Sequence, residues 1–408
     1  MTKRLDSQNG FDCAVIGGGP AGLTAAIALC EAGARTALIA RLAPYSDNRT
    51  TALLGGSHEL LERLDVWRRC ADKAAPLRVM RLIDDTHRLF HAPEIRFSSD
   101  EIKLETFGYN IENANLVAAL EQRCAELPNL TRIDDEAATV TPHADAVEIT
   151  TQGGRKLATP LVIGADGRRS LCRSAAGITV DSRALHQAAV TFNISHARPH
   201  HDTSTEFHTA HGPCVFVPLP GNRSSVVWVT TPAEAARMVE MSDAELAEIV
   251  ERQMQSIYGR VTVAPGRHTF PLAIERPSRF AAHRIVLVGE AAHVLPPIGA
   301  QGLNLGLRDA ADVAAIVSEA LKAGEDPGSP RVLTKFESAR RADITTRTWA
   351  VDMANRTLLG DFLPTQAFRA FGMHLLANVG PLRRIAMREG LQPSWRRSPP
   401  PPRHGPGR

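Results

Sequence analysis

The sequence predicts an α/β protein in which a Rossmann-like domain is interleaved with an antiparallel-sheet domain and followed by C-terminal helices. A βαβ pattern opens the chain between residues 11 and 40. The stretch 185–270 is rich in Thr, Val, His and Phe and has the pattern of antiparallel strands. A buried-strand pattern returns at 284–288, so we expect the first domain to be discontinuous.

The elements of the first domain are predicted from short apolar runs and from helical spacing of apolar residues. Strands are expected at 11–16, 35–40 and 161–163. Helices are expected at 23–34, 58–69 and 115–127. We therefore assign to this domain the residues 11–76, 110–182 and 283–330.

The second domain is predicted from alternating polar and apolar residues. Strands are expected within 77–97, around a turn at 84–88, and within 185–270, where a helix at 233–258 interrupts them. We assign residues 77–109 and 183–282 to this domain. The chain is then largely helical from 309 to the mid-380s, which defines a C-terminal helical region, 331–391. The Pro- and Arg-rich end, 392–408, is expected to be a disordered basic tail.

Composition limits the classes of function. A net charge of +3 disfavours nucleic acid as a partner. The uncharged run 13–30 is long enough for a membrane span, but its four glycines and one proline favour a tight turn. Six Cys without a C-x-x-C pair are typical of a reducing compartment, so we expect a cytoplasmic protein. From Pro381 onward there are seven Arg and one Glu, which indicates either a solubilising tail or a surface for anionic lipid headgroups.

The first motif is the G-x-G-x-x-G pattern of Gly17, Gly19 and Gly22, between a predicted strand and a predicted helix. Such glycines allow a tight turn and let a pyrophosphate approach the helix N-terminus, where free N–H groups favour anions. The usual companion is an acidic residue at the end of the second strand, which binds a ribose. Here that strand ends in Ala40 and Arg41. Another residue must therefore hold the ribose, or binding is weaker.

Two further motifs follow in order. Residues 164–173, GADGRRSLCR, match D-G-x-x-S-x-x-R, and residues 289–309, GEAAHVLPPIGAQGLNLGLRD, are crowded with small residues after a buried strand. Together with the first motif, they make the sequence similar to class A FAD-dependent aromatic monooxygenases of the p-hydroxybenzoate hydroxylase fold. The resemblance implies that the first domain is a Rossmann-like FAD-binding domain of the GR2 type and that the second domain binds substrate.

The resemblance also implies which residues contact FAD. In this family small residues after the strand let backbone N–H groups reach the flavin, and the following helix N-terminus favours the charge of the reduced ring. Glu290 stands where the family has Asp, so its contact with a ribityl hydroxyl is expected to shift. The cofactor-binding residues expected are Gly17, Gly19, Gly22, Arg41, Arg49, Asp166, Gly289, Glu290, Gly302, Leu303 and Asn304.

The stretch 48–67, NRTTALLGGSHELLERLDVW, resembles the ubiquinone-biosynthesis hydroxylase subfamily, as do 107–116 and the helical C-terminal end. Its Arg-Thr-Thr-Ala-Leu box would place Arg49 beside the flavin, whereas the alternative is a surface salt bridge. The subfamily signature H-P-x-A-G-Q-G is replaced here by Pro296-Pro297-Ile298-Gly299-Ala300-Gln301-Gly302, a variant that p-hydroxybenzoate hydroxylase shares. The substrate therefore stays open on sequence alone.

The implied chemistry is hydroxylation of the aromatic ring of a polyprenyl phenol in ubiquinone biosynthesis. NAD(P)H would reduce bound FAD as a transient co-substrate, and O2 would react through a C4a-hydroperoxyflavin. Arg49 and Pro297 are the expected catalytic residues, with Pro297 lining the space above the ring. No base is identified, and His293 is interpreted as structural. The expected partners are the polyprenyl phenol, O2, other ubiquinone-biosynthesis proteins and the inner face of the membrane as a peripheral contact.

Two alternative functions remain open. A hydroxylase of a soluble phenolic acid needs a cationic anchor, for which Arg223 is a candidate. A non-catalytic flavoprotein scaffold of the ubiquinone pathway is suggested by the departures at Ala40 and Glu290. The histidines of 195–213 invite a metal interpretation, but their spacing matches no standard site, so no metal is expected. They are His196, His200, His201, His208 and His211.

Overall fold

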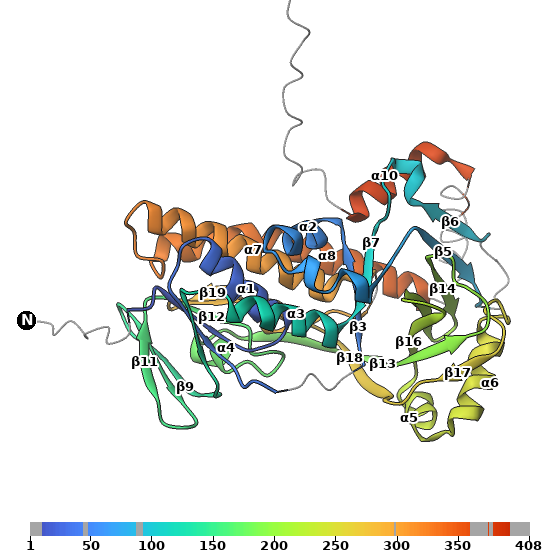
Figure 1. Ribbon diagram of the computed structural model, residues 1–408, viewed down its shortest axis with the longest axis horizontal. Helices are drawn as coiled ribbons and strands as arrows, with labels where there is room; N and C mark the ends of the chain where they lie inside the picture. The colour runs from blue at the N-terminus through green and yellow to red at the C-terminus, as the bar shows by residue number, and fades with distance from the viewer. Residues whose placement is uncertain are drawn as a thin grey trace, which may run out of the picture.

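The computed structural model describes residues 10–43, 48–86, 93–297, 299–359, 374 and 378–391 (Figure 1). The expected tail at 392–408 lies outside these residues, as does most of 360–377 in the expected helical region. Residues 87 and 88 of the expected turn also lie outside them.

A six-stranded sheet forms the first layer, in the order β19-β20-β12-β1-β2-β8. Its strands come from well-separated stretches of the chain and are parallel except for β19. They are β1 (Cys13–Ile16), β2 (Thr36–Ile39), β8 (Leu130–Ile133), β12 (Val162–Gly164), β19 (Ala281–Ala282) and β20 (Ile285–Leu287). Strands β1, β2, β12 and β20 are buried at every residue. Full burial of this kind is expected for a parallel sheet that is covered on both faces.

Helices cover this sheet and continue its core. Helix α1 packs against both α3 and α7, and α8 packs against α7 (Figure 1). These helices are α1 (Pro20–Glu31), α3 (Asn113–Ala125), α7 (Gln301–Lys322) and the 30-residue α8 (Pro330–Leu359). The shorter elements around them are α2 (Gly55–Arg63), η1 (Trp67–Arg69), η2 (Ala71–Lys73), α4 (Leu171–Ala175) and η4 (Gly289–Ala291). Among the described residues, no helix combines the length and apolar character that crossing a bilayer requires.

An eight-stranded sheet forms the second body. Its strands are β5 (Val79–Asp84), β6 (Ile95–Ser98), β13 (Val180–His196), β14 (Thr203–Thr209), β15 (Gly212–Leu219), β16 (Arg223–Thr230), β17 (Val261–Val263) and β18 (His268–Pro277). All pairs are antiparallel except β5 with β14, which is parallel. The expectation of an antiparallel sheet therefore holds for every pair but this one. The exception arises because β5 joins from a distant part of the chain, and strand direction across such a connection is not encoded locally.

The helix expected at 233–258 is two helices, so that prediction was wrong. Helices α5 (Pro232–Glu240) and α6 (Asp243–Gln253) are separated by a break at Met241 and Ser242. Ser242 accepts a hydrogen bond from the Glu245 N–H, and the Glu245 carboxylate accepts one from the Ser242 N–H at 2.9 Å. This capping box starts a new helix, and the spacing S-x-x-E was its readable signal.

Two small sheets were not anticipated from the sequence. One contains β3 (Thr50–Leu54), β7 (Gly108–Glu112) and β4 (Ala74–Pro76), and the other contains β9 (Ala137–Pro142), β10 (Val147–Thr151) and β11 (Lys156–Thr159). The first is tied to the eight-stranded sheet, because the Asn110 side chain donates to the Pro218 carbonyl at 2.9 Å.

The C-terminal helix α10 (Gly380–Leu391) contacts η3 (Ser99–Ile102), which lies far from it in the sequence. We propose that the two large sheets mark the two domains expected from the sequence.

Candidate active site

The three sequence motifs follow three neighbouring strands of the six-stranded sheet. The loops start after β1, β12 and β20, which are adjacent and parallel in the order β20-β12-β1. Since parallel strands end at the same edge, the three loops lie together there. The edge is therefore where a nucleotide cofactor is expected to bind.

Gly17 and Gly22 serve the packing of this edge. Gly17 has φ +119, and a Cβ at that position would lie 2.2 Å from the Ala165 carbonyl oxygen. A Cβ at Gly22 would lie 2.1 Å from the Gly17 carbonyl oxygen. The Ala165 N–H also donates to the Ile16 carbonyl at 2.8 Å. The first motif thus brings the β1 loop into backbone contact with the second motif, which no larger residue permits.

Gly19 has a different role. It is the N-cap of α1, and a Cβ placed there meets no protein atom within 4 Å. No side chain caps the helix, and the first turn contains Pro20 and no acidic residue. An uncapped helix N-terminus presents backbone N–H groups to an anion, and the open space at Gly19 leaves room for one. This arrangement fits a pyrophosphate.

The second motif connects to the third through Arg173. Its guanidinium donates to the Ala291 carbonyl at 3.0 Å and to the Arg168 carbonyl at 2.7 Å. Asp166 accepts from the Ser170 hydroxyl at 2.6 Å and from the Cys172 N–H at 3.0 Å. Its carboxylate therefore organises the turn into α4.

In the third motif, Asn304 locks the start of α7 to strand β3. Its side-chain amide donates to the Ala52 carbonyl at 2.7 Å and to the Ala300 carbonyl at 2.6 Å, and its oxygen accepts from the Leu54 N–H at 3.0 Å. The residue is fully buried. The side chain is therefore fully used in holding the start of α7 to β3.

The first turn of α7 has the features of an anion-facing helix end. No side chain caps it, and Ala300 has the left-handed φ of +54 that turns the chain into the helix. Gly302 is exposed, and a Cβ there meets nothing within 4 Å. Leu303, the next residue, is partly buried and packs against the core. Pro297 is exposed just before this turn.

Arg49 and Glu290 meet at this edge. Arg49 Nη1 lies 3.9 Å from Glu290 Oε1, and its guanidinium lies 5.1 Å from the centre of the Phe270 ring. Both side chains are partly exposed. The Arg-Thr-Thr-Ala-Leu box, which is far from the third motif in sequence, is thus next to it in space.

The end of β2 lacks the acidic residue of the dinucleotide-binding pattern. Ala40 is buried, and Arg41 donates to the Gln152 side chain at 2.9 Å and pairs with Glu136 at 3.3 Å. Asp134, after the neighbouring strand β8, accepts from the Leu42 N–H at 2.6 Å. Acidic side chains therefore reach this edge from β8 rather than from β2, which the sequence spacing did not indicate.

The histidine-rich stretch is built into the second sheet. His196 lies between the Arg198 carbonyl at 2.7 Å and the Ser224 hydroxyl at 3.0 Å, and it stacks on Tyr258. His200 contacts the Leu219 carbonyl at 3.0 Å, and burial lowers the pKa of His196. Within the described ranges, no group of three His, Cys, Asp or Glu residues is arranged to hold a metal ion.

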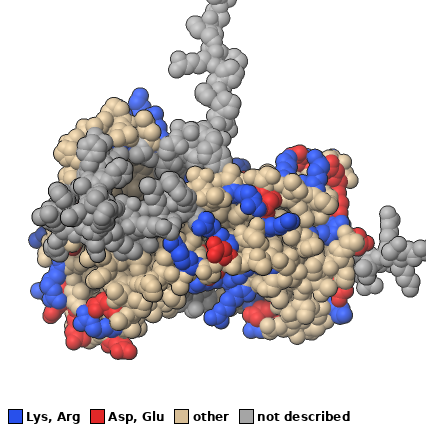
Figure 2. Space-filling view, turned by 180° about the vertical axis from the view of Figure 1, so that it is seen from behind, with Lys and Arg blue, Asp and Glu red and all other residues tan. Residues whose placement is uncertain are grey.

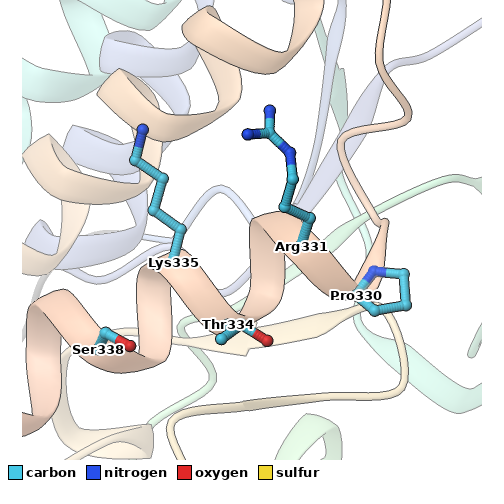
Figure 3. A pocket seen from close by; sticks show the side chains of 5 residues that line it. All are labelled: Pro330, Arg331, Thr334, Lys335 and Ser338. Atoms are coloured by element: carbon cyan, nitrogen blue, oxygen red, sulfur yellow. The ribbon is translucent and has the colours of Figure 1, made fainter.

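A shallow depression on α8 is separate from the motif loops (Figure 3). Its lining residues are Pro330, Arg331, Thr334, Lys335 and Ser338. Arg331 is paired with Glu325, and Lys335 is paired with Glu319. None of the three motifs contributes to it, so we do not regard it as the active site.

Comparison with known proteins identifies the family. The family described as "FAD binding domain" matches residues 11–348. The chain is 32% identical over 403 residues to the ubiquinone hydroxylase UbiL of Rhodospirillum rubrum, covering 96% of this chain and 92% of that protein. The chain belongs to the FAD-dependent monooxygenases. It is also 30% identical over 390 residues to the 3-demethoxyubiquinol 3-hydroxylase of Escherichia coli, covering 93% and 98% of the two chains.

Solved structures show the same fold as this monooxygenase. The p-nitrophenol 4-monooxygenase PnpA of Pseudomonas putida superposes with a TM-score of 0.77 at 20% identity, over 93% of this chain and 98% of that one. The predictions of fold class, FAD as cofactor with NAD(P)H as co-substrate, and monooxygenase activity are confirmed. The individual site residues stay predictions.

Proposed function

We propose that this monooxygenase hydroxylates the aromatic ring of a polyprenyl-phenol intermediate of ubiquinone biosynthesis. The observation that carries this proposal is its similarity over nearly the whole chain to two proteins named as ubiquinone-pathway hydroxylases. The second supporting feature is the position of Arg49, whose Arg-Thr-Thr-Ala-Leu box resembles that subfamily, beside Glu290 of the third motif.

The described residues fit FAD along the edge of the six-stranded sheet. The open N-terminus of α1 at Gly19 would receive the pyrophosphate, with Gly17 and Gly22 shaping the turn. Arg41 and Asp166 would lie toward the nucleotide and ribityl parts, as would the carboxylate of Glu290, whereas the Gly289 N–H is already bonded to Asp309 at 2.9 Å. At α7, the backbone N–H groups would face the pyrimidine edge of the ring from Gly302, Leu303 and Asn304.

When bound, FAD supplies the oxygen chemistry, with NAD(P)H as the source of electrons. The chain supplies binding, orientation and charge. Arg49 would place a cation beside the ring, and its pairing with Glu290 and its contact with Phe270 hold the guanidinium at that edge. Pro297, exposed before α7, would line the space for the phenol. Exclusion of water from that space would favour transfer of oxygen to the phenol over release of hydrogen peroxide.

The alternative of a soluble phenolic acid is less well supported. Its candidate anchor, Arg223, pairs with Glu112 at 2.9 Å, and Glu112 also accepts from the Asn193 side chain at 3.1 Å. Because an acidic partner already neutralises Arg223, a substrate carboxylate would have to displace Glu112. The non-catalytic alternative is disfavoured because the similar proteins are named as hydroxylases.

Because a polyprenyl phenol is a lipid, we also propose that the protein reaches it through a peripheral contact of α10 with the membrane surface. The exposed face of α10 carries Leu382 and Ile385, which are 40% and 59% exposed, and the exposed cations Arg384 and Arg388. Arg383 ties the helix to η3 through Glu101 at 2.7 Å. Apolar side chains flanked by cations are the pattern of helices that lie on anionic bilayers.

Figure 2 shows the charges on the described part of the face opposite to that in Figure 1. Lys and Arg side chains are mixed there with Asp and Glu.

The quinone-lipid profile of a deletion strain tests the proposal. We expect loss of ubiquinone and accumulation of an under-hydroxylated polyprenyl phenol, with rescue by the wild-type gene and no rescue by Gly19→Glu. The structure of the accumulated phenol would identify the hydroxylated carbon. A normal ubiquinone profile in a strain with no second hydroxylase for the step would overturn the proposed substrate.

A further inference from the structure

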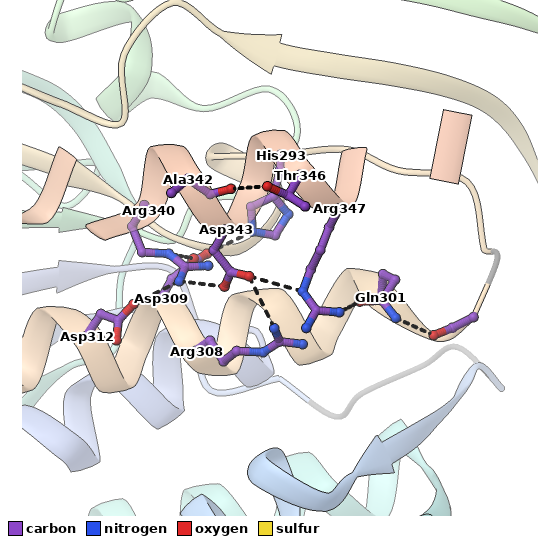
Figure 4. Close-up of polar contacts among 11 residues, drawn as sticks. His293, Gln301, Arg308, Asp309, Asp312, Arg340, Ala342, Asp343, Thr346 and Arg347 are labelled. Atoms are coloured by element: carbon purple, nitrogen blue, oxygen red, sulfur yellow. Dashed lines mark hydrogen bonds and ion pairs between the residues drawn. The ribbon is translucent and has the colours of Figure 1, made fainter. Parts of the chain in front are cut away.

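A chain of polar contacts, buried except near Gln301, joins the two ends of the loop 289–301, of which Ile298 lies outside the described residues (Figure 4). At its first end, Asp309 accepts from the Gly289 N–H at 2.9 Å and contacts His293 Nε2 at 2.8 Å through the same carboxylate oxygen. The other oxygen of Asp309 accepts from Arg340 Nε at 2.6 Å. The start of the loop is therefore tied through α7 to α8.

The contacts continue along α8 to the second end of the loop. Arg340 Nη1 donates to Asp343 at 2.9 Å, and Asp343 accepts from Arg347 Nε at 3.0 Å. Arg347 Nη1 donates to the Gln301 side-chain oxygen at 2.6 Å, and the Gln301 amide donates to the Gly299 carbonyl at 2.8 Å. Arg340, Asp343 and Arg347 are spaced by three and four residues, which places them on one face of the helix.

These charges are removed from water. Arg340, Asp309 and Asp343 are fully buried, and Arg347 is nearly so. Burial alone would raise the pKa of Asp309, but Arg340 and His293 beside it hold that pKa below its ordinary value. The carboxylate is therefore charged at neutral pH, and so is the guanidinium of Arg340.

The packing of α8 against α7 does not require these buried charged side chains. Phe336 and Ile344 of α8 are buried in the same core. Because desolvation offsets much of the attraction within a buried ion pair, apolar residues would hold two helices together as well. Hydrogen bonds depend on direction as well as distance, so a chain of them stabilises one arrangement of the groups that it connects. Here the connected groups are the two ends of the loop, and the chain of hydrogen bonds therefore stabilises one arrangement of these ends.

We propose that Arg340, Asp343 and Arg347 are positioning residues that hold the loop 289–301 in the shape that accepts the flavin. This inference rests on the proposed contact between that loop and FAD. Arg347 is the most informative of the three, because it is the member that contacts Gln301, the first residue of α7. Its removal leaves Asp343 still paired with Arg340 and Arg308, so no buried carboxylate loses all its partners.

The test compares FAD binding to purified apoprotein for Arg347→Gln, Arg347→Lys and Arg341→Gln. Arg341 is the matched control, since it lies on the same helix, its side chain is 57% exposed, and its partners, Glu337 and the Ser278 carbonyl at 3.3 Å, lie outside residues 289–301. We expect Arg347→Gln to raise the dissociation constant of FAD about tenfold and to shift the visible spectrum of bound flavin. Arg347→Lys should restore part of both, and Arg341→Gln should match the parent. The melting temperature of the apoprotein reports separately on folding.

Two results would overturn the inference alone. Arg347→Gln could bind FAD within twofold of the parent with an unchanged spectrum, or it could weaken binding no more than Arg341→Gln does. Gly302→Ala, in the first turn of α7 directly after the loop, tests the proposed flavin contact at this end of the loop. If neither Gly302→Ala nor Arg347→Gln alters FAD binding, the proposed contact between loop and flavin fails, and the positioning role fails with it.

Discussion

Gly302→Ala separates the stability of the protein from its affinity for FAD. Gly302 is the second residue of α7, its φ is outside the left-handed region, and an added Cβ meets no protein atom within 4 Å. The methyl group therefore fits the folded chain without strain. If the flavin lies against this turn, the methyl group occupies space that the cofactor needs.

The two effects have opposite signs. Alanine restricts the unfolded chain more than glycine and is the better helix former, so the apoprotein should gain about 0.5 kcal/mol of unfolding free energy. For a chain of this size that corresponds to a rise in melting temperature of about 1 °C. The loss of close backbone approach to the ring should weaken FAD binding about tenfold or more, which is about 1.4 kcal/mol.

Differential scanning fluorimetry of apoprotein and fluorescence titration with FAD measure the two effects on one sample. Thr334→Ala on the exposed face of α8 is the control (Figure 3), because it also improves helix propensity and lies in a depression to which no motif contributes. It should raise the melting temperature slightly and leave FAD affinity unchanged. Parental FAD affinity in Gly302→Ala would refute the placement of the ring against α7.

Four further substitutions follow from the geometry. Gly22→Ala forces a methyl group to within 2.1 Å of the Gly17 carbonyl, so urea denaturation should show a loss of about 1–3 kcal/mol; an unchanged midpoint would contradict the packing role. Arg340→Gln removes the buried cation that Asp309 and Asp343 share and should cost about 3–5 kcal/mol, whereas a loss below about 1 kcal/mol would show the network to be dispensable. Burial depresses the pKa of His196, so its stabilising contribution is complete above about pH 6.5 and is lost as pH falls. His196→Gln should flatten that pH dependence of the melting temperature, and an unaltered profile would exclude His196 as its source. Arg223→Gln should change the KM for a polyprenyl phenol less than threefold, and a large rise in KM would instead show that Arg223 takes part in binding that substrate.

The sequence predicted those parts of the site that depend on a single residue type in a local turn. Gly17 has the positive φ that only glycine adopts readily, and Gly22 lies against its carbonyl, as the spacing required. The strand and helix around them follow from short apolar runs. Such features are local, so each is readable without knowledge of the rest of the chain.

The contacts between segments could not be predicted. Arg173 reaches the Ala291 carbonyl across 118 residues, and Arg340 reaches Asp309 across 31. In a sequence, Arg340 and Asp343 resemble the charges of an exposed helix face, because their burial depends on how α8 packs. The Ser242 capping box was different, since its signal was local and was overlooked in the sequence interpretation.

Incorporation of oxygen from ¹⁸O2 by the purified enzyme tests the central claim most directly. The reaction would contain FAD, NAD(P)H and a short-chain polyprenyl phenol in detergent, with p-hydroxybenzoate as the soluble comparison. We expect a product heavier by one ¹⁸O atom on the ring of the polyprenyl phenol and none with p-hydroxybenzoate. Labelled product from p-hydroxybenzoate alone, or NAD(P)H oxidation that yields only hydrogen peroxide with the polyprenyl phenol, would contradict the proposed function.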